Sequence, residues 1–202
     1  MHPRSLVNCL LCSMLSLPLA AAAQQAAPPA GSESKAQREM MQRVASATAL
    51  GPQQQALTQY LGHWAVDIEL PGQHVHSTGT ADYSWVIPGR WLGCRISGAI
   101  LGQPFEEFTI LGYDSFARSL VEVSVESADN SMLMSRGSPQ PPAGGPSVLY
   151  GELDEYNSGS LHRPYKVVMQ WLSPTRHVTQ VWDLGTGEHP VEKISFTFTR
   201  PN

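Results

Sequence analysis

From residue 64 onward, apolar and polar residues alternate one by one in short runs, and turn-forming residues separate the runs. The first run reads WAVDIEL over residues 64–70. Successive side chains of a β-strand point to opposite faces, so a period of two predicts strands with one buried and one solvated face. Further runs of this kind occupy residues 75–87, 91–100, 105–111, 120–127, 132–136, 148–156, 165–172, 177–184 and 191–200.

The connections between these runs are short and contain turn formers, for example Pro71-Gly72, Pro88-Gly89 and Ser173-Pro174. Short strands joined by tight turns indicate successive antiparallel hairpins. An open sheet of this size would leave two edges unpaired, whereas closure into a barrel removes them. The sequence therefore predicts an all-β fold, a single antiparallel up-and-down β-barrel of about ten strands over residues 62–202, with a sandwich as the alternative.

The first residues predict export. Residues 1–23 combine Arg4, an apolar run over residues 6–19 and a small-residue cleavage site at residues 20–23, as secretory signal peptides do. The run is short and is interrupted by Asn8 and Pro18, which favours a cleaved signal over a retained membrane helix. Cleavage after Ala23 would give a secreted or periplasmic protein with no membrane association.

Two further segments precede the strands. Residues 24–33 are small, polar and proline-containing, which is typical of a disordered tether. Residues 34–61 contain helix formers, with Ala36, Met40 and Val44 spaced by four, and Gly51-Pro52 starts a second short helix. In that helix Leu57, Tyr60 and Leu61 share one face. We expect these N-terminal helices to cover one end of the barrel.

Cysteine content and charge restrict the possible functions. Two of the three cysteines lie in the signal peptide, so the mature chain has Cys94 alone and no internal disulfide can form. The remaining chain of about 180 residues fits one domain, which its core must stabilise. The formal net charge is −4, and no basic patch predicts binding to nucleic acid or to an anionic membrane.

The two ends of the strand region carry a matching set of residues. Gly62 and Trp64 begin the first strand, and Arg200 ends the last. In a closed barrel the Arg200 guanidinium can stack over the Trp64 ring, while Gly62 lets the chain pass close across the barrel end. This arrangement resembles the structural signature of the calycin superfamily, in which a Gly-X-Trp on the first strand meets an Arg near the end of the last.

Four stretches, in order and with similar spacing, resemble the bacterial domain-of-unknown-function 1579 family: LGHWAVDIEL, STGTADYSWVIPGRWL, LGQPFEEFTILGYD and ISFTFTR. The resemblance covers residues 53–200 and departs at the insertion SPQPPAGGPS, which lengthens one loop. It implies a calycin-like, lipocalin-like barrel in a secreted bacterial protein, and it supplies no catalytic residue.

Catalytic and metal-binding motifs are absent from the sequence. It contains no nucleophile elbow, phosphate loop, dinucleotide fingerprint or haem-attachment motif, so no cofactor is predicted. His74 and His76 belong to a polar row, which favours a solvated strand face over a metal site. Adjacent Glu106 and Glu107 must point to opposite faces and cannot form a close acid/base pair. Cys94 is best explained as a small core residue.

The predicted barrel interior is rich in aromatic and sulfur-containing side chains, which suits a cavity for a small, mainly apolar molecule. The candidate lining residues are Tyr83, Trp85, Phe108, Met132, Met134, Met169, Trp171 and Trp182, together with Arg95 as a polar neighbour for an acidic head group. Binding of such a molecule is the leading hypothesis. The alternatives are an enzyme of isomerase or hydrolase type, with Tyr83 or an inward carboxylate as acid/base group, and a structural or interaction domain with a filled core.

Overall fold

The computed structural model describes residues 34–139, 145–155, 158–185, 187 and 189–201. The expected signal peptide (residues 1–23), the expected tether (residues 24–33) and the middle of the SPQPPAGGPS insertion lie outside the described residues.

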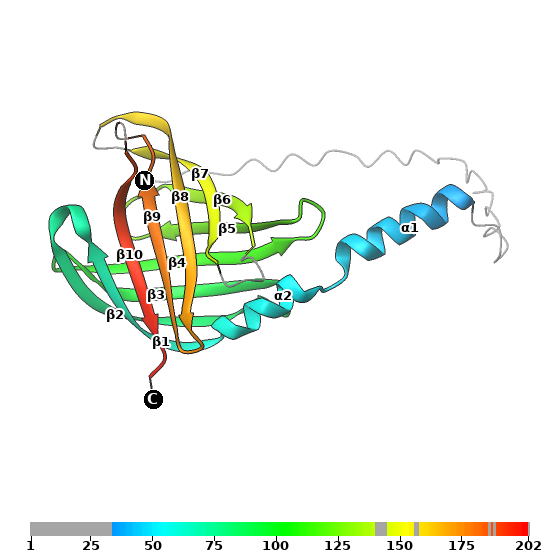
Figure 1. The fold of residues 1–202 in the computed structure, drawn as a ribbon, viewed down its shortest axis with the longest axis horizontal. Coiled ribbons are helices and arrows are strands. Elements are labelled where there is room, and N and C mark those ends of the chain that lie inside the picture. Colours follow the sequence, from blue (N-terminus) through cyan, green and yellow to red (C-terminus); the bar gives the residue numbers. More distant parts are fainter. Residues whose placement is uncertain (1–33, 140–144, 156–157, 186, 188, 202) are drawn as a thin grey trace, which may run out of the picture. The chain divides into compact units, whose positions relative to one another are not determined.

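Ten antiparallel strands form a closed barrel (Figure 1). Each strand pairs with its neighbours in the sequence, and the first pairs with the last, so that Val66 lies opposite Phe198. This up-and-down topology confirms the predicted barrel and excludes the sandwich. The strands are β1 (Gly62–Leu70), β2 (Val75–Ile87), β3 (Trp91–Ile100), β4 (Gln103–Asp114), β5 (Ser119–Glu126), β6 (Met132–Ser138), β7 (Ser147–Glu155), β8 (Ser160–Ser173), β9 (Arg176–Asp183) and β10 (Val191–Thr199).

The alternation in β1 shows how the sequence specifies this sheet. Trp64, Val66 and Ile68 are at most 1% exposed, whereas the intervening Ala65 is exposed to solvent. A shift of register by one residue would move the whole apolar row into water, so burial of this row fixes the pairing. Gly62 begins the strand with φ of 109°, a conformation that favours glycine.

Three helical elements precede the barrel. Helix α1 (Lys35–Thr48) has no buried residue. Helix α2 (Pro52–Ala56) leads into the short 3-10 helix η1 (Leu57–Tyr60), whose Leu57 and Tyr60 are buried in the barrel core. The Gln54 amide donates a hydrogen bond of 2.7 Å to the Ser115 hydroxyl, which ties α2 to the turn after β4. The structure therefore shows burial against the barrel for α2 and η1.

One end of the barrel, which we call the closed end, is filled by η1 and a cluster of rings. The Arg200 guanidinium lies over the Trp64 ring, 4.5 Å from its centroid, in the arrangement expected from the sequence. The Trp64 indole N–H donates to the Tyr60 carbonyl over 2.7 Å, and Arg200 donates to the Gln59 carbonyl over 2.6 Å. These contacts hold η1 across the barrel end.

His177 lies inside this ring cluster. Its imidazole stacks on Phe198 with centroids 4.2 Å apart and contacts the rings of Tyr60, Trp64 and Trp171. Burial, and then the nearby charge of Arg200, lowers the pKa of His177 to about 3. The imidazole is therefore neutral at physiological pH and acts as a packing group.

No helix among the described residues combines the length and apolar character needed to cross a membrane.

Candidate functional site

The barrel interior contains a cavity of about 460 Å³. Its lining reaches the end of the barrel opposite the closed end, where Gln73, Leu101 and Asp129 lie in the connections after β1, β3 and β5 and Asp154 lies near the end of β7. These residues form a mouth. Pockets that bind small molecules measure about 300–1,000 Å³, so this cavity has the size of a ligand site. The interior is hollow, which argues against the filled-core alternative.

Most of the lining on one side of the cavity is apolar. Strands β8, β9 and β10 present what we call the apolar wall, which consists of Val167, Met169, Val181, Phe196 and Phe198. Phe105 of β4 stacks on Phe196 with ring centroids 6.5 Å apart and extends this surface around the barrel. A ligand body placed here would lose most of its apolar contact with water, which is the main source of affinity in such pockets.

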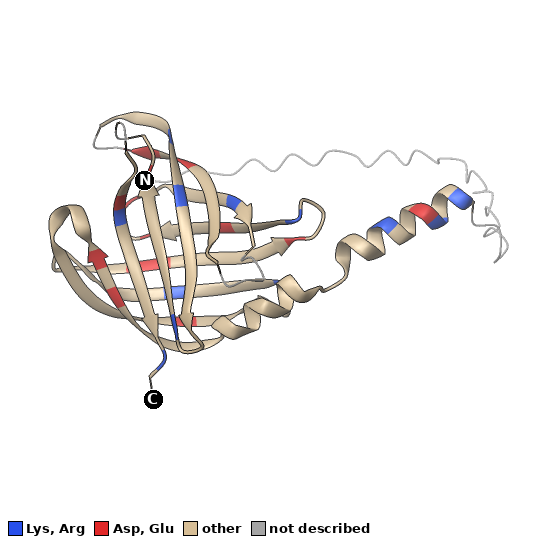
Figure 2. Ribbon diagram, viewed as in Figure 1, with Lys and Arg blue, Asp and Glu red and all other residues tan. Residues whose placement is uncertain are grey.

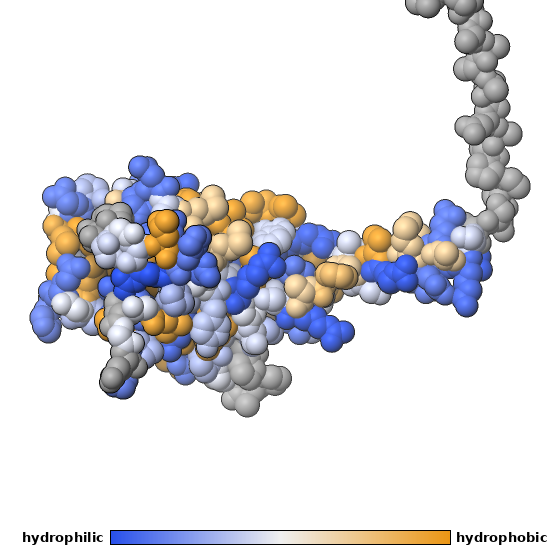
Figure 3. Space-filling view, turned by 90° about the horizontal axis from the view of Figure 1, so that it is seen from above, coloured by the Kyte–Doolittle hydropathy of each residue, from blue (hydrophilic) through white to orange (hydrophobic). Residues whose placement is uncertain are grey.

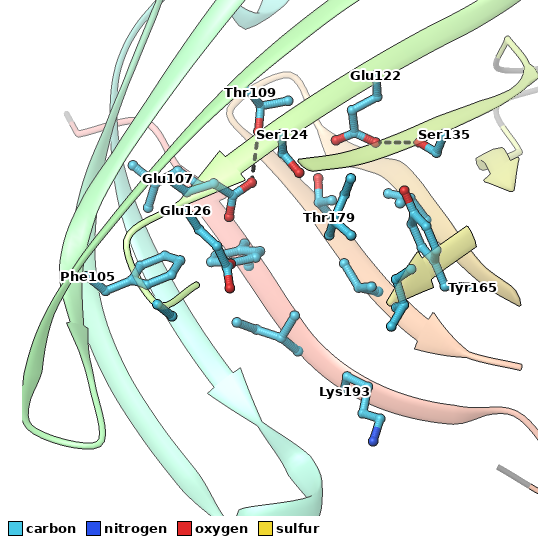
Figure 4. Close-up of a pocket in the computed structure, with 18 of the residues that line it drawn as sticks. Phe105, Glu107, Thr109, Glu122, Ser124, Glu126, Ser135, Tyr165, Thr179 and Lys193 are labelled. Carbon is cyan, nitrogen blue, oxygen red and sulfur yellow. Dashed lines mark hydrogen bonds between the residues drawn. The ribbon is translucent and has the colours of Figure 1, made fainter. Parts of the chain in front are cut away.

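The opposite side carries what we call the acidic stripe, formed by inward residues of β4, β5 and β6 (Figure 4). Glu107 and Glu126 lie directly opposite each other, and Glu122 lies opposite Ser135, deeper in the barrel. The stripe comprises Glu107, Thr109, Glu122, Ser124, Glu126 and Ser135. It runs from the mouth toward the closed end, because β4 and β5 both cross the cavity along their length.

Hydroxyl groups support two of the three carboxyl groups. The Thr109 hydroxyl donates a hydrogen bond of 2.8 Å to Oε1 of Glu107, and the Ser135 hydroxyl donates one of 3.1 Å to Oε2 of Glu122 (Figure 4). Each of these carboxyl groups is thus held in place through one oxygen. The second oxygen of each has no described hydrogen-bond partner and is available to a molecule in the cavity.

Burial changes the protonation of the stripe. Glu107 and Glu122 border the cavity space but are otherwise surrounded by protein, and this desolvation raises the pKa of each to about 7. The Thr109 and Ser135 hydrogen bonds act in the opposite direction, and the charges of Glu122 and Glu126 add to the rise at Glu107. Near neutral pH each group is therefore divided between its acid and carboxylate forms.

A group of charges lies beside the mouth. Asp183, which is 1% exposed, accepts a hydrogen bond of 2.6 Å from Arg163 and has the Lys193 ammonium within 3.5 Å. Arg163 also contacts Glu155 at 3.4 Å. Figure 2 shows acidic and basic residues side by side on β10, where Lys193 follows Glu192. These pairs join β7, β8, β9 and β10 at the rim of the cavity.

The structure places two of the predicted lining residues, Tyr83 and Met169, on the cavity. Trp85 and Trp171 are half-buried, pack against the core and do not line it. Burial raises the pKa of Tyr83 well above its usual value, so its phenol keeps its proton and cannot serve as a base.

The predicted place on the cavity lining is wrong for five residues, because their side chains face outward. Met132 and Met134 are 64% and 48% exposed, and apolar residues do reach the barrel surface (Figure 3). Arg95 lies 5.4 Å over the Phe108 ring and pairs with exposed Glu106 at 3.6 Å. Trp182 lies under the Lys166 ammonium at 5.0 Å, while its neighbour Asp183 points inward.

The physical reason for these errors is that the inward and outward faces of several strands were assigned the wrong way round. In β4 the inward row is Phe105, Glu107, Thr109 and Leu111, a mixed row that hides which face is buried. The alternation of apolar and polar residues did not identify Glu107, Glu122 and Glu126 as site residues. One signal was available: Glu107 is separated from Phe105 and from Leu111 by an even number of positions, so its side chain points to the same face of the strand as theirs.

Among the described residues, no group of three or more His, Cys, Asp or Glu is arranged to hold a metal ion.

The fold and its cavity define a class, the closed up-and-down β-barrel with a hollow interior that opens at one end. The chain belongs to the DUF1579 family, described as a protein of unknown function, whose model matches residues 50–200. This match confirms the resemblance found in the sequence. A search of curated proteins gave no match.

Solved structures also resemble the barrel. The Rv2717c protein from M. tuberculosis is 15% identical, with a TM-score of 0.53, over 76% of this chain and 100% of that chain. EF1p2_mFAP2b bound to DFHBI is 12% identical, with a TM-score of 0.40, over 74% of this chain and 99% of that chain. The redesigned β-barrel mFAP1, bound to DFHBI, is 14% identical, with a TM-score of 0.37, over 72% of this chain and 98% of that chain. The first likeness supports the barrel fold.

Proposed function

We propose that the protein binds a small, mainly apolar molecule inside its barrel, in the periplasm or outside the cell. The observation that carries the proposal is the cavity of about 460 Å³. Interiors of folded domains are normally packed without voids larger than a water molecule, so a space of this size requires a use. The cavity is sealed at the closed end and lined by the apolar wall, and its mouth provides a route of entry.

Binding of a neutral apolar dye tests this proposal. We expect N-phenylnaphthylamine to bind saturably, one molecule per folded chain, with increased fluorescence. Met169→Trp places a larger side chain on the cavity lining and should weaken binding at least about tenfold. Met134→Trp makes the same change on the outer face, where Met134 is 48% exposed, and should leave the affinity unchanged. A folded wild-type protein that binds neither this dye nor apolar probes of other sizes would refute the proposal.

Export makes a separate prediction. Removal of residues 1–23 should give a mature protein that begins near Gln24. N-terminal sequencing of protein recovered from the periplasm or the medium measures this directly. Recovery of that protein with Met1 still present would contradict a cleaved signal.

A second candidate is an enzyme that uses the same cavity. It is favoured by Glu107 and Glu122, because a carboxyl group whose pKa is raised to about 7 can both donate and accept a proton at neutral pH. Such groups cluster at catalytic sites, although burial alone also produces them. The distinguishing result is chemical conversion of a bound molecule by the wild type and retention of binding without conversion by Glu107→Gln or Glu122→Gln.

A further inference from the structure

The charges that line the cavity are strongly unbalanced. The acidic lining residues are Glu107, Glu122, Glu126, Asp129, Asp154, Glu155 and Asp183, and among the described lining residues Lys193 alone is basic. The Lys193 ammonium lies 3.5 Å from Asp183, and in Figure 4 it lies away from the three glutamates. Arg163, which lies behind the lining, pairs with Glu155 and Asp183 at the rim, so the excess negative charge lies mainly on the acidic stripe. That part of the interior favours positive charge and disfavours negative charge.

Within the part of the chain that the structure describes, no cation pairs with the three glutamates of the acidic stripe. None of the ion pairs among the described residues includes Glu107, Glu122 or Glu126. Glu107 and Glu126 also lie directly opposite each other, an arrangement of like charges that destabilises a sheet. A buried carboxylate is normally paired with a cation or neutralised by a proton, so a cationic ligand would supply the countercharge when these groups are ionised.

The geometry suits a donor with several N–H groups. Figure 4 shows the carboxyl groups of Glu107, Glu122 and Glu126 along one side of the cavity. Thr109 and Ser135 each occupy one carboxyl oxygen, which leaves the other oxygen of Glu107 and of Glu122 free. An ammonium group has three donors and no acceptor, and its hydrogen bonds to carboxylates are among the strongest in proteins.

We propose that the ligand of this barrel carries a positively charged amine, which binds to the acidic stripe, and an apolar body, which packs on the apolar wall. The inference rests on the proposed function, because it specifies the chemical class that the same cavity accepts. An aromatic ring near the stripe also suits a cation: Phe105 lies on β4, two residues before Glu107, and stacks on Phe196 of the apolar wall. Ring faces attract ammonium groups.

Three probes of equal chain length separate charge from apolar size: octylamine, octanol and octanoate. Their affinities for the full-length wild-type protein are measured by isothermal titration calorimetry and by displacement of N-phenylnaphthylamine. The measurements are made at about pH 8, where the stripe is largely ionised and octylamine is protonated. Octylamine should bind at least about tenfold more tightly than octanol, and octanoate should bind more weakly than either.

Glutamine variants locate the effect. Glu107→Gln and Glu122→Gln keep the size of the side chain and an oxygen that accepts from Thr109 or Ser135, but they remove the charge. Each should weaken octylamine binding about tenfold and change octanol binding by less than about twofold. Glu106→Gln is the matched control, because Glu106 is the outward neighbour of Glu107 and its side chain is 65% exposed. It should leave all three affinities unchanged.

The outcomes separate this inference from the function on which it rests. If octanol or octanoate binds as tightly as octylamine, the ligand is not a cation and the binding function stands. Equal losses of octylamine and octanol in the glutamine variants would also overturn the inference, because the carboxyl groups would then only shape the cavity. If neither the dye nor any of the three probes binds to the folded protein, the binding function itself is wrong.

Discussion

Replacement of Trp64 by alanine should lower the free energy of unfolding by about 3–5 kcal/mol, as expected for a fully buried aromatic side chain. Trp64 is 1% exposed, contacts the rings of Tyr83, Trp171 and His177, and holds η1 through its hydrogen bond to Tyr60. Urea unfolding of the purified variant measures the loss. Trp182→Ala removes a half-buried outward ring and should cost less, which makes it the control.

The contact between Trp64 and Arg200 is tested by a double-mutant cycle. With the guanidinium 4.5 Å from the ring centroid, Trp64→Ala and Arg200→Ala should couple with an interaction energy of about 0.5–2 kcal/mol. Additive effects would show that the stacking contributes nothing to stability. A loss below about 1 kcal/mol for Trp64→Ala would contradict the role of the ring in sealing the closed end.

The second large effect concerns the acidic stripe and pH. Burial raises the pKa of Glu107 and Glu122 to about 7 in the folded protein, above the value of 4.5 for an unperturbed glutamate. The folded state thus binds more protons than the unfolded state, so these groups reduce stability as the pH rises from 4.5 through about 7. Because glutamine carries no charge to desolvate, Glu107→Gln and Glu122→Gln should each stabilise the protein by about 2–3 kcal/mol at pH 8.

The informative quantity is the difference in unfolding free energy between variant and wild type, measured from pH 5 to pH 8. This difference should be small at the acidic end and should grow with pH, whereas Glu106→Gln should give a flat line. A difference that is constant with pH, or a destabilisation at high pH, would refute the assignment. The titrating groups that share the cavity with Glu107 and Glu122 are Tyr83, Cys94, Glu126, Asp129, Asp154, Glu155, Tyr165, Asp183 and Lys193.

A gain in stability from removing these carboxyl groups would itself be evidence about function. Groups that lower the stability of a fold are tolerated where they serve a ligand or a reaction. The affinity measurements with octylamine and the unfolding measurements use the same variants. Loss of amine binding together with a gain in stability would assign the acidic stripe to recognition rather than to the architecture of the barrel.

Strand alternation predicts the architecture better than it predicts the site. In β1 the apolar row of Trp64, Val66 and Ile68 is unmixed, so its inward face could be read from the sequence. In β4 the inward row contains both Phe105 and Glu107, because the side chains that line a hollow barrel need not all be apolar. Met134 faces solvent for the related reason that a sheet surface tolerates apolar side chains. Hydrophobic pattern therefore fails where a cavity replaces a packed core.

The pairing of β1 with β10 has a consequence for how the molecule reaches its native state. β1 is the first strand made and β10 the last, so the backbone edge of β1 has no partner until nearly the whole barrel sequence is available. Contacts between distant parts of a chain form slowly, since the entropy of closing a long loop is lost before any contact compensates it. Trp64 lies near the start of β1 and Arg200 follows β10, so the pairing of these two strands and the assembly of the ring cluster occur together, late in folding. A nascent chain that stops short of β10 would present the apolar row of β1 on an open edge and would be prone to aggregation.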